Sequence, residues 1–320
     1  MDSDERKKEL LSTLFTLRGA EFSRCFAPPP FCPNAAIRAH SVQNARCLDL
    51  IASDGHVIAP NLRLAAEKAP AIDLAPVGRN RATTFSGLCE KHDRQIFASI
   101  ETGPINVHTI EHRFLLAYRA TFYEVHATCA AASQVQLAYQ KRAQLGFDPA
   151  DAPSEAGLLA THRIIVAYET FRYKEGFDEA YLKPAFDILE HDLITFDVAR
   201  PTVAACALFS FDHLRRDDHS VGVCLNILPI EQTKTIVLLS YLRSDAPLAR
   251  TELHRILTTS GDLQKYEVSR RLLNNCQNFV LSPSYVASWT PAKRQIILDY
   301  FVRTLLYDDL EFEHADLCLF

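Results

Sequence analysis

The stretch RCFAPPPFCP (residues 24–33) constrains the fold most, because it sets two cysteines, Cys25 and Cys32, among four prolines. Proline has a fixed φ and no backbone N–H, so this stretch cannot form a regular helix. The chain must therefore turn between the two cysteines. A loop of this kind cannot bury its backbone in regular structure and gains from a cross-link, which makes both thiols candidate metal ligands.

A second pair of metal-binding side chains follows in FSGLCEKHDRQIF (85–97), where Cys89 stands three positions before His92. Apolar residues then recur at helical spacing at Ile96 and Ile100, which places the pair on the first turn of a predicted helix. Backbone N–H groups and the helix dipole stabilise a thiolate there. Zinc prefers thiolate and imidazole ligands in a tetrahedron, and two close pairs far apart in sequence often supply them.

The sequence therefore predicts a structural zinc site with the ligands Cys25, Cys32, Cys89 and His92. The alternative is that Cys89 is a small buried apolar residue and His92 a surface residue at a helix start. Five other cysteines lie in apolar or amphipathic patterns and are expected in the core: Cys47, Cys129, Cys206, Cys224 and Cys276. The total of nine cysteines is odd and the chain has no export signal, so a reducing cytoplasm is expected rather than a disulfide framework.

Residues 21–101 resemble the HNH, or ββα-metal, nuclease motif, which is a relative of the treble clef. The order that carries the resemblance is a cysteine pair, a strand ending in His40, a loop, and then Leu88-Cys89 with His92-Asp93 on a helix. The resemblance implies that His40 is a general base that deprotonates an attacking water. It also implies that Asp93 binds a catalytic Mg²⁺ or Mn²⁺ ion. His40 could instead be a fifth candidate for the four zinc positions, or a histidine hydrogen-bonded inside the module.

Two positions depart from that motif. The residue before the base, often Asp or His, is Ala39 here. The middle asparagine of the motif has no clear counterpart, and Asn44 and Asn80 are the two candidates. The motif's metal site is therefore incomplete in this sequence.

The chain is also similar over most of its length to a group of uncharacterised bacterial proteins. The shared segments are the helix from Cys89 to Glu101, the segment LAYRA (116–120) and the segment QNFVLSP (277–283). This similarity implies no activity. Arg119, within the second segment, could reach Glu101 or a phosphate.

The charge is unevenly distributed along the chain. Up to residue 150 there are 17 Lys and Arg against 15 Asp and Glu, and beyond it 17 against 24, within a net charge of −5. The less acidic N-terminal half leaves a nucleic-acid surface possible there. No apolar run reaches the roughly 18 residues of a membrane helix, so no membrane partner is expected.

The pattern of elements predicts an α+β protein. Long helices are expected at 107–145 and 155–173, and three apolar runs at 202–212, 221–230 and 233–242 predict an antiparallel meander with helices after it. Residues 53–84 hold Gly, Pro, Asn and Asp at irregular intervals and predict a long excursion. GFDPADAP (146–153) is the predicted boundary between a zinc-binding, HNH-like module with a long helix (1–150) and an α+β domain (151–320).

Two functional hypotheses follow from these patterns. The first is an HNH-like nucleic-acid-processing protein that hydrolyses phosphodiesters with a divalent metal. The second is a non-catalytic protein in which zinc stabilises the fold or a partner-binding surface.

Overall fold

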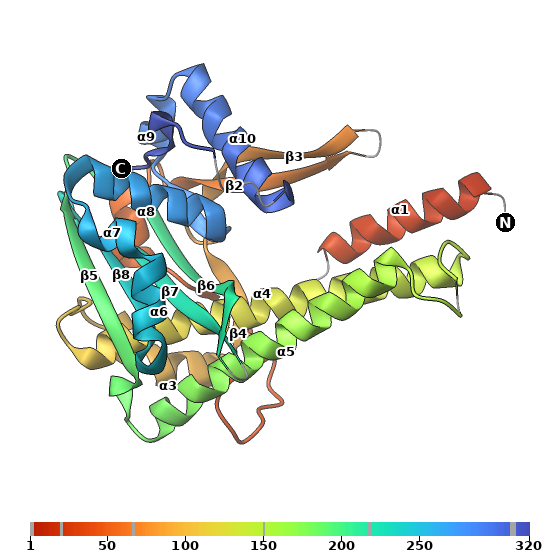
Figure 1. The fold of residues 1–320 in the computed structure, drawn as a ribbon, viewed down its shortest axis with the longest axis horizontal. Helices are drawn as coiled ribbons and strands as arrows, with labels where there is room; N and C mark the ends of the chain where they lie inside the picture. The colour runs from red at the N-terminus through yellow and green to blue at the C-terminus, as the bar shows by residue number, and fades with distance from the viewer. Residues whose placement is uncertain (1–2, 20–21, 66–67, 150, 217–218, 308–311) are drawn as a thin grey trace.

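A computed structural model describes residues 3–19, 22–65, 68–149, 151–216, 219–307 and 312–320. Its centre is a seven-stranded antiparallel sheet in the order β3-β2-β9-β6-β7-β8-β5. A separate two-stranded pair is formed by β1 and β4. The expected α+β class is confirmed (Figure 1).

The strands of the large sheet come from both halves of the sequence. They are β2 (His56–Ala65), β3 (Lys68–Gly78), β5 (Leu189–Asp197), β6 (Val203–Arg216), β7 (His219–Glu231), β8 (Lys234–Leu242) and β9 (Phe279–Leu281). The predicted meander is confirmed as β6, β7 and β8. Alternate residues of these strands enter different cores: Cys224 and Leu228 of β7 face one, Val223 and Leu225 the other. Because both faces are buried, the strands read as continuous apolar runs.

Helices cover both faces of the sheet (Figure 1). The described helices of the protein are α1 (Ser3–Gly19), α2 (Asp49–Ile51), α3 (Glu90–Glu101), α4 (Ile110–Gln144), α5 (Glu155–Leu182), α6 (Ala246–Glu252), α7 (His254–Thr258), α8 (Gly261–Asn275), α9 (Pro283–Ala287) and α10 (Pro291–Tyr307). Every residue of α4 from Phe114 to Phe122 is buried. A helix buried all round belongs to a core, and α4 packs against β6, β7 and β8 on one side and α3 and α5 on others.

The N-terminal module, residues 22–101, contains a short two-stranded antiparallel sheet. Strand β1 (Ile37–His40) pairs antiparallel with β4 (Thr84–Leu88), and α3 follows β4 directly. The cysteine loop lies against β4, where the Phe26 N–H donates to the Gly87 carbonyl at 2.9 Å. The order of cysteine loop, strand β1 and helix α3 is the order that the sequence predicts for this module.

The prediction of an excursion over residues 53–84 is wrong, because most of this segment forms the β2–β3 hairpin. Prolines at 60, 70 and 76 concealed it, since proline is rare in central strands. They are tolerated because β3 is an edge strand and β2 pairs with β9 only at Ile58. The hairpin places N-terminal strands in the same sheet as C-terminal strands, while the two-domain division stays a prediction.

No helix in the described part of the chain combines the length and apolar character that a bilayer crossing needs. The longest helices, α4 and α5, form an antiparallel pair beside the sheet (Figure 1). Their joining turn contains Gly146, whose φ of +74° is left-handed and favours glycine. Arg142 holds this turn by an ion pair with the buried Asp148 at 2.6 Å.

Candidate metal centre

The four side chains predicted as zinc ligands converge at the end of β4. Their ligand atoms all lie within 4.8 Å of one another, and the described residues contain no other such group of His, Cys, Asp and Glu ligands. These four residues, Cys25, Cys32, Cys89 and His92, are called the Cys3His cluster below. All three cysteines are buried and free of disulfides.

The distances within the Cys3His cluster fit one tetrahedral zinc ion. With Zn–S bonds of about 2.3 Å and a Zn–N bond of about 2.0 Å, tetrahedral geometry separates two sulfurs by about 3.8 Å and sulfur from nitrogen by about 3.5 Å. The Sγ atoms of Cys32 and Cys89 are 3.9 Å apart. The His92 Nδ1 lies 3.3 Å from the Cys25 Sγ and 3.4 Å from the Cys89 Sγ. The cluster could therefore bind zinc with little rearrangement.

The backbone of β4 positions the first cysteine. The Arg24 N–H donates to the Ser86 carbonyl at 3.4 Å, and Phe26 continues this pairing at Gly87. A side chain at position 87 would not fit, because a Cβ there would lie 2.6 Å from a ring carbon of Phe85. Glycine at this position therefore lets the Phe85 ring pack against Tyr123 and His126 of α4.

The start of α3 positions the other pair. Cys89 is the extended residue that precedes the helix, with φ −76° and ψ 161°, and His92 lies in the first turn. Burial opposes ionisation of the Cys89 thiol. Hydrogen bonds from the His92 backbone N–H and from neighbouring side chains outweigh it, so the pKa of Cys89 is lowered. Burial instead raises the pKa of Cys25 to about 11, so a bound cation would be needed to keep both as thiolates.

His40, the predicted general base, lies outside the Cys3His cluster, which gives no support to its alternative role as a zinc ligand. It ends β1, and its Nε2 lies 3.1 Å from the Arg79 carbonyl oxygen. Burial lowers the pKa of His40, which the Arg79 hydrogen bond only partly offsets. His40 is therefore neutral at neutral pH.

Asp93, the predicted ligand of a catalytic metal, follows His92 in the first turn of α3. Burial raises the pKa of Asp93, while the charges of Arg119 and His40 lower it. The two predicted catalytic residues are thus close enough for ionisation of each to affect the pKa of the other. Ala39 beside His40 is buried and offers no ligand atom. A catalytic role for either residue stays a prediction.

Contacts place three further residues that the sequence left open. Asn44 donates from Nδ2 to the Asn80 Oδ1 at 2.8 Å, so the two asparagine candidates lie side by side. Arg119 reaches Glu101, with 2.6 Å between Nη1 and Oε1, and its guanidinium lies over the Phe97 ring. Arg119 is 2% exposed, and its ion pair with Glu101 holds α3 against α4.

Sequence reasoning missed a buried polar network beside the module. The Lys174 ammonium donates to both carboxylate oxygens of Asp178, at 2.6 and 2.7 Å, and the Tyr118 hydroxyl donates to Oδ1. Lysine and aspartate four residues apart on a helix normally form a solvated pair, so the spacing gives no sign of burial. Asp178 also lines a cavity of about 670 Å³ together with Cys25 and Cys32.

Comparisons of the chain with protein-family models, with curated proteins and with solved structures each found no match.

Proposed function

We propose that the protein is a zinc-stabilised phosphodiesterase of HNH-like design, in which His40 is the general base and Asp93 binds a divalent cation. Zinc in the Cys3His cluster would fix the cysteine loop and the start of α3 beside the β1–β4 pair. His40 ends β1 of that pair and Asp93 lies in the first turn of α3. Zinc binding would therefore pre-position both residues.

The hydrogen bond between His40 and Arg79 carries the proposal. A carbonyl oxygen only accepts, so the Nε2 of His40 bears the hydrogen and donates it to Arg79. The Nδ1 of the neutral ring then holds the free lone pair, which is the state that a general base requires. The lowered pKa of His40 keeps this state populated at neutral pH.

The reaction that this geometry supports is hydrolysis of a phosphodiester. The His40 Nδ1 takes a proton from a water, the water oxygen forms a bond to phosphorus, and the bond from phosphorus to the leaving oxygen breaks. A divalent cation held at Asp93 would stabilise the charge on the phosphate and on the leaving oxygen. The module also exposes basic side chains for a nucleic-acid substrate, among them Arg81, Lys91 and Arg94.

A plasmid-cleavage assay with added Mg²⁺ or Mn²⁺ tests the proposal. The wild type should cleave, and His40→Ala should lose about 10²- to 10⁴-fold in rate, the usual contribution of general-base catalysis. The matched control is His56→Ala, which removes an exposed histidine of the same module. Equal cleavage by wild type and His40→Ala would contradict the proposal.

The second candidate function is non-catalytic stabilisation by zinc, and the buried Ala39 favours it because the motif's second ligand is missing. This candidate predicts full zinc occupancy without cleavage by the wild type. Zinc content measured on the assayed protein distinguishes it from loss of the metal site, since an inactive protein that retains zinc supports this candidate.

A further inference from the structure

The seven-stranded sheet ends in two edge strands, β3 and β5, which differ in whether a further strand can be added. In an antiparallel pair, successive residues of a strand direct their backbone N–H and C=O groups alternately toward the partner strand and away from it. At an edge, the groups directed away have no strand to pair with. Native proteins usually protect them with proline, charge, a bulge or a covering element.

The outer side of β3 is protected. The Arg79 N–H donates to the Gly55 carbonyl at 2.9 Å in register with the β2–β3 pair, so odd-numbered residues of β3 face β2 and even-numbered residues face outward. Pro76 is one of the outward residues and has no N–H. The carbonyl of Leu74, another outward residue, accepts a hydrogen bond from Arg294 of α10 at 3.0 Å. This edge is therefore closed to a further strand.

The outer side of β5 is open. The Val198 N–H donates to the Thr233 carbonyl at 2.9 Å in register with the β5–β8 pair, so even-numbered residues of β5 face β8. Its odd-numbered residues, from Leu189 to Asp197, face outward. In the part of the chain that the structure describes, no group hydrogen-bonds to the outward N–H and C=O groups of these residues. Strand β5 forms the left margin of the sheet in Figure 1.

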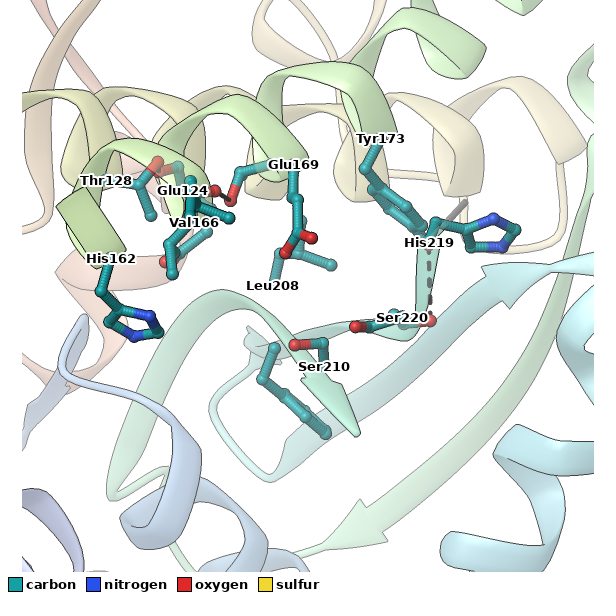
Figure 2. Close-up of a pocket in the computed structure, with 14 residues that line it drawn as sticks. Glu124, Thr128, His162, Val166, Glu169, Tyr173, Leu208, Ser210, His219 and Ser220 are labelled. Carbon is teal, nitrogen blue, oxygen red and sulfur yellow. Dashed lines mark hydrogen bonds between the residues drawn. The ribbon is translucent and has the colours of Figure 1, made fainter. Parts of the chain in front are cut away.

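Strand β5 also lacks the usual protection of an edge. It has nine residues without proline or lysine, and its register with β8 is unbroken. Elsewhere in the sheet a neighbouring helix supplies a donor where strand pairing stops: Tyr173 of α5 points toward β7 (Figure 2), and its hydroxyl donates to the Gly222 carbonyl at 3.4 Å. A long, regular and uncovered edge such as β5 is a template for another strand.

The apolar side chains of β5 fit a covered edge. Leu189 and Leu193 pack against the core on one face of the sheet, while Ile194 and Phe196 pack against the core on the other face. Leu193 and Ile194 are only partly buried. A strand added beside β5 would bury both further, one on each face, and so extend both cores.

We propose that β5 pairs antiparallel with β5 of a second copy of the chain, so that the two sheets join across a two-fold axis. Leu193 is the central residue of Leu189–Asp197, so pairing over the full strand places the axis beside Leu193. In this register the outward residues of the two copies meet. Leu193 opposes its own copy and His191 opposes Thr195, and each such pair exchanges two backbone hydrogen bonds.

The charges of β5 favour this partner. The three carboxylates of β5 would each oppose an apolar residue, in the pairs Glu190–Phe196, Asp192–Ile194 and Asp197–Leu189. No carboxylate would therefore stand directly opposite another, the arrangement that destabilises a sheet. Arg250 of α6 already pairs with Glu190 at 2.8 Å and with Asp192 at 3.3 Å. These two acids thus neither repel a second copy nor call for a strand with basic side chains.

Sedimentation equilibrium of the full chain at micromolar concentration tests the proposal. The wild type should have twice the mass of the 36.0 kDa chain. Thr195→Pro should weaken the dimer about 10-fold or more, because it removes one outward N–H from each copy. Thr195 is exposed, and an edge strand tolerates proline where the N–H faces outward. Thr195→Val keeps the N–H, so this matched control should dimerise like the wild type.

Disulfide cross-linking tests the register and does not depend on the folding of Thr195→Pro. In Leu193→Cys the two introduced thiols would lie in one hydrogen-bonded pair, where the Cα atoms are about 5.5 Å apart and a disulfide can form. Mild oxidation should therefore give a covalent dimer that a reducing agent separates. Thr195→Cys is the matched control, because position 195 opposes His191 rather than itself and should stay uncross-linked.

Three results would overturn the proposal. The first is a wild type with the mass of a single chain, which would leave the β5 edge to a strand of another protein. The second is a Thr195→Pro variant that keeps the wild-type melting temperature and dimerises like the wild type. The third is equal cross-linking of Leu193→Cys and Thr195→Cys.

Discussion

The Nδ1 of His92 lies 3.3 Å from the Sγ of Cys25, although 67 residues separate them in the sequence. The contact joins a proline-rich loop to the first turn of α3, two segments with no regular backbone pairing to each other. A metal ion bound there would close the loop onto the helix, and structural zinc contributes folding free energy directly.

Replacement of Cys89 by serine should therefore destabilise the protein strongly. Loss of one thiolate removes a zinc ligand, and we expect a loss of about 4 kcal/mol in the free energy of unfolding. Urea unfolding followed by circular dichroism measures it. Cys129→Ser, a half-buried cysteine outside the cluster, should have a much smaller effect. An unchanged stability of Cys89→Ser would contradict the metal centre.

Gly87→Ala should destabilise the N-terminal module by about 1–3 kcal/mol, the usual effect of overpacking a core. The added Cβ would lie 2.6 Å from the buried Phe85 ring, which must move. Gly103→Ala is the matched control, because a Cβ there meets no atom within 4 Å. Similar urea midpoints for the two variants would show that the Phe85 packing contributes nothing.

The two lysine–acid pairs of α5 should differ greatly in strength, although both have the same four-residue spacing. Asp178→Asn leaves the Lys174 ammonium, 1% exposed, without a counter-charge and should cost about 3 kcal/mol or more. Glu179→Gln breaks the Lys183 pair, whose side chains are 71% and 72% exposed, and should cost less than about 0.5 kcal/mol. Chemical denaturation of both variants tests this, and equal losses would be inconsistent with a buried Lys174.

Stability should fall as the pH drops from about 6.5 toward 4, in part because of His191. Burial, aided by the charge of Arg113, lowers the pKa of His191 to about 4. Between these pH values the His191 imidazole binds a proton in the unfolded chain but stays neutral in the folded chain. Acid therefore favours unfolding in this window by up to about 3 kcal/mol.

Urea unfolding at pH 7 and pH 5 measures this effect of His191. His191→Gln should flatten the pH dependence, while replacement of the exposed His254 should leave it unchanged. The same slope in wild type and His191→Gln would rule out the contribution of His191.

The features that could be predicted from the sequence are those with a clear local pattern: the metal ligands, the meander and the two long helices. The pair Cys25 and Cys32 lies in a proline-rich loop, and the pair Cys89 and His92 lies at a helix start, both outside apolar core patterns. The four ligands of the Cys3His cluster could therefore be predicted from these two distant pairs. The meander β6–β8 was readable because strands buried on both faces are continuous apolar runs. The helices α4 and α5 were readable from their apolar periodicity.

The remaining features depend on contacts that local sequence does not carry. The β2–β3 hairpin was missed because its prolines argue against strands, and only its edge position makes them acceptable. The Tyr118–Asp178–Lys174 network was missed because burial of α5 residues is decided by α4, 60 residues earlier for the Tyr118–Asp178 pair.

Zinc K-edge X-ray absorption of the protein, purified with its bound metal, tests the central claim most directly. The account predicts one zinc per chain, with three sulfur neighbours at about 2.3 Å and one nitrogen neighbour at about 2.0 Å. Absence of zinc from the purified protein, or a first shell with fewer than three sulfurs, would contradict it.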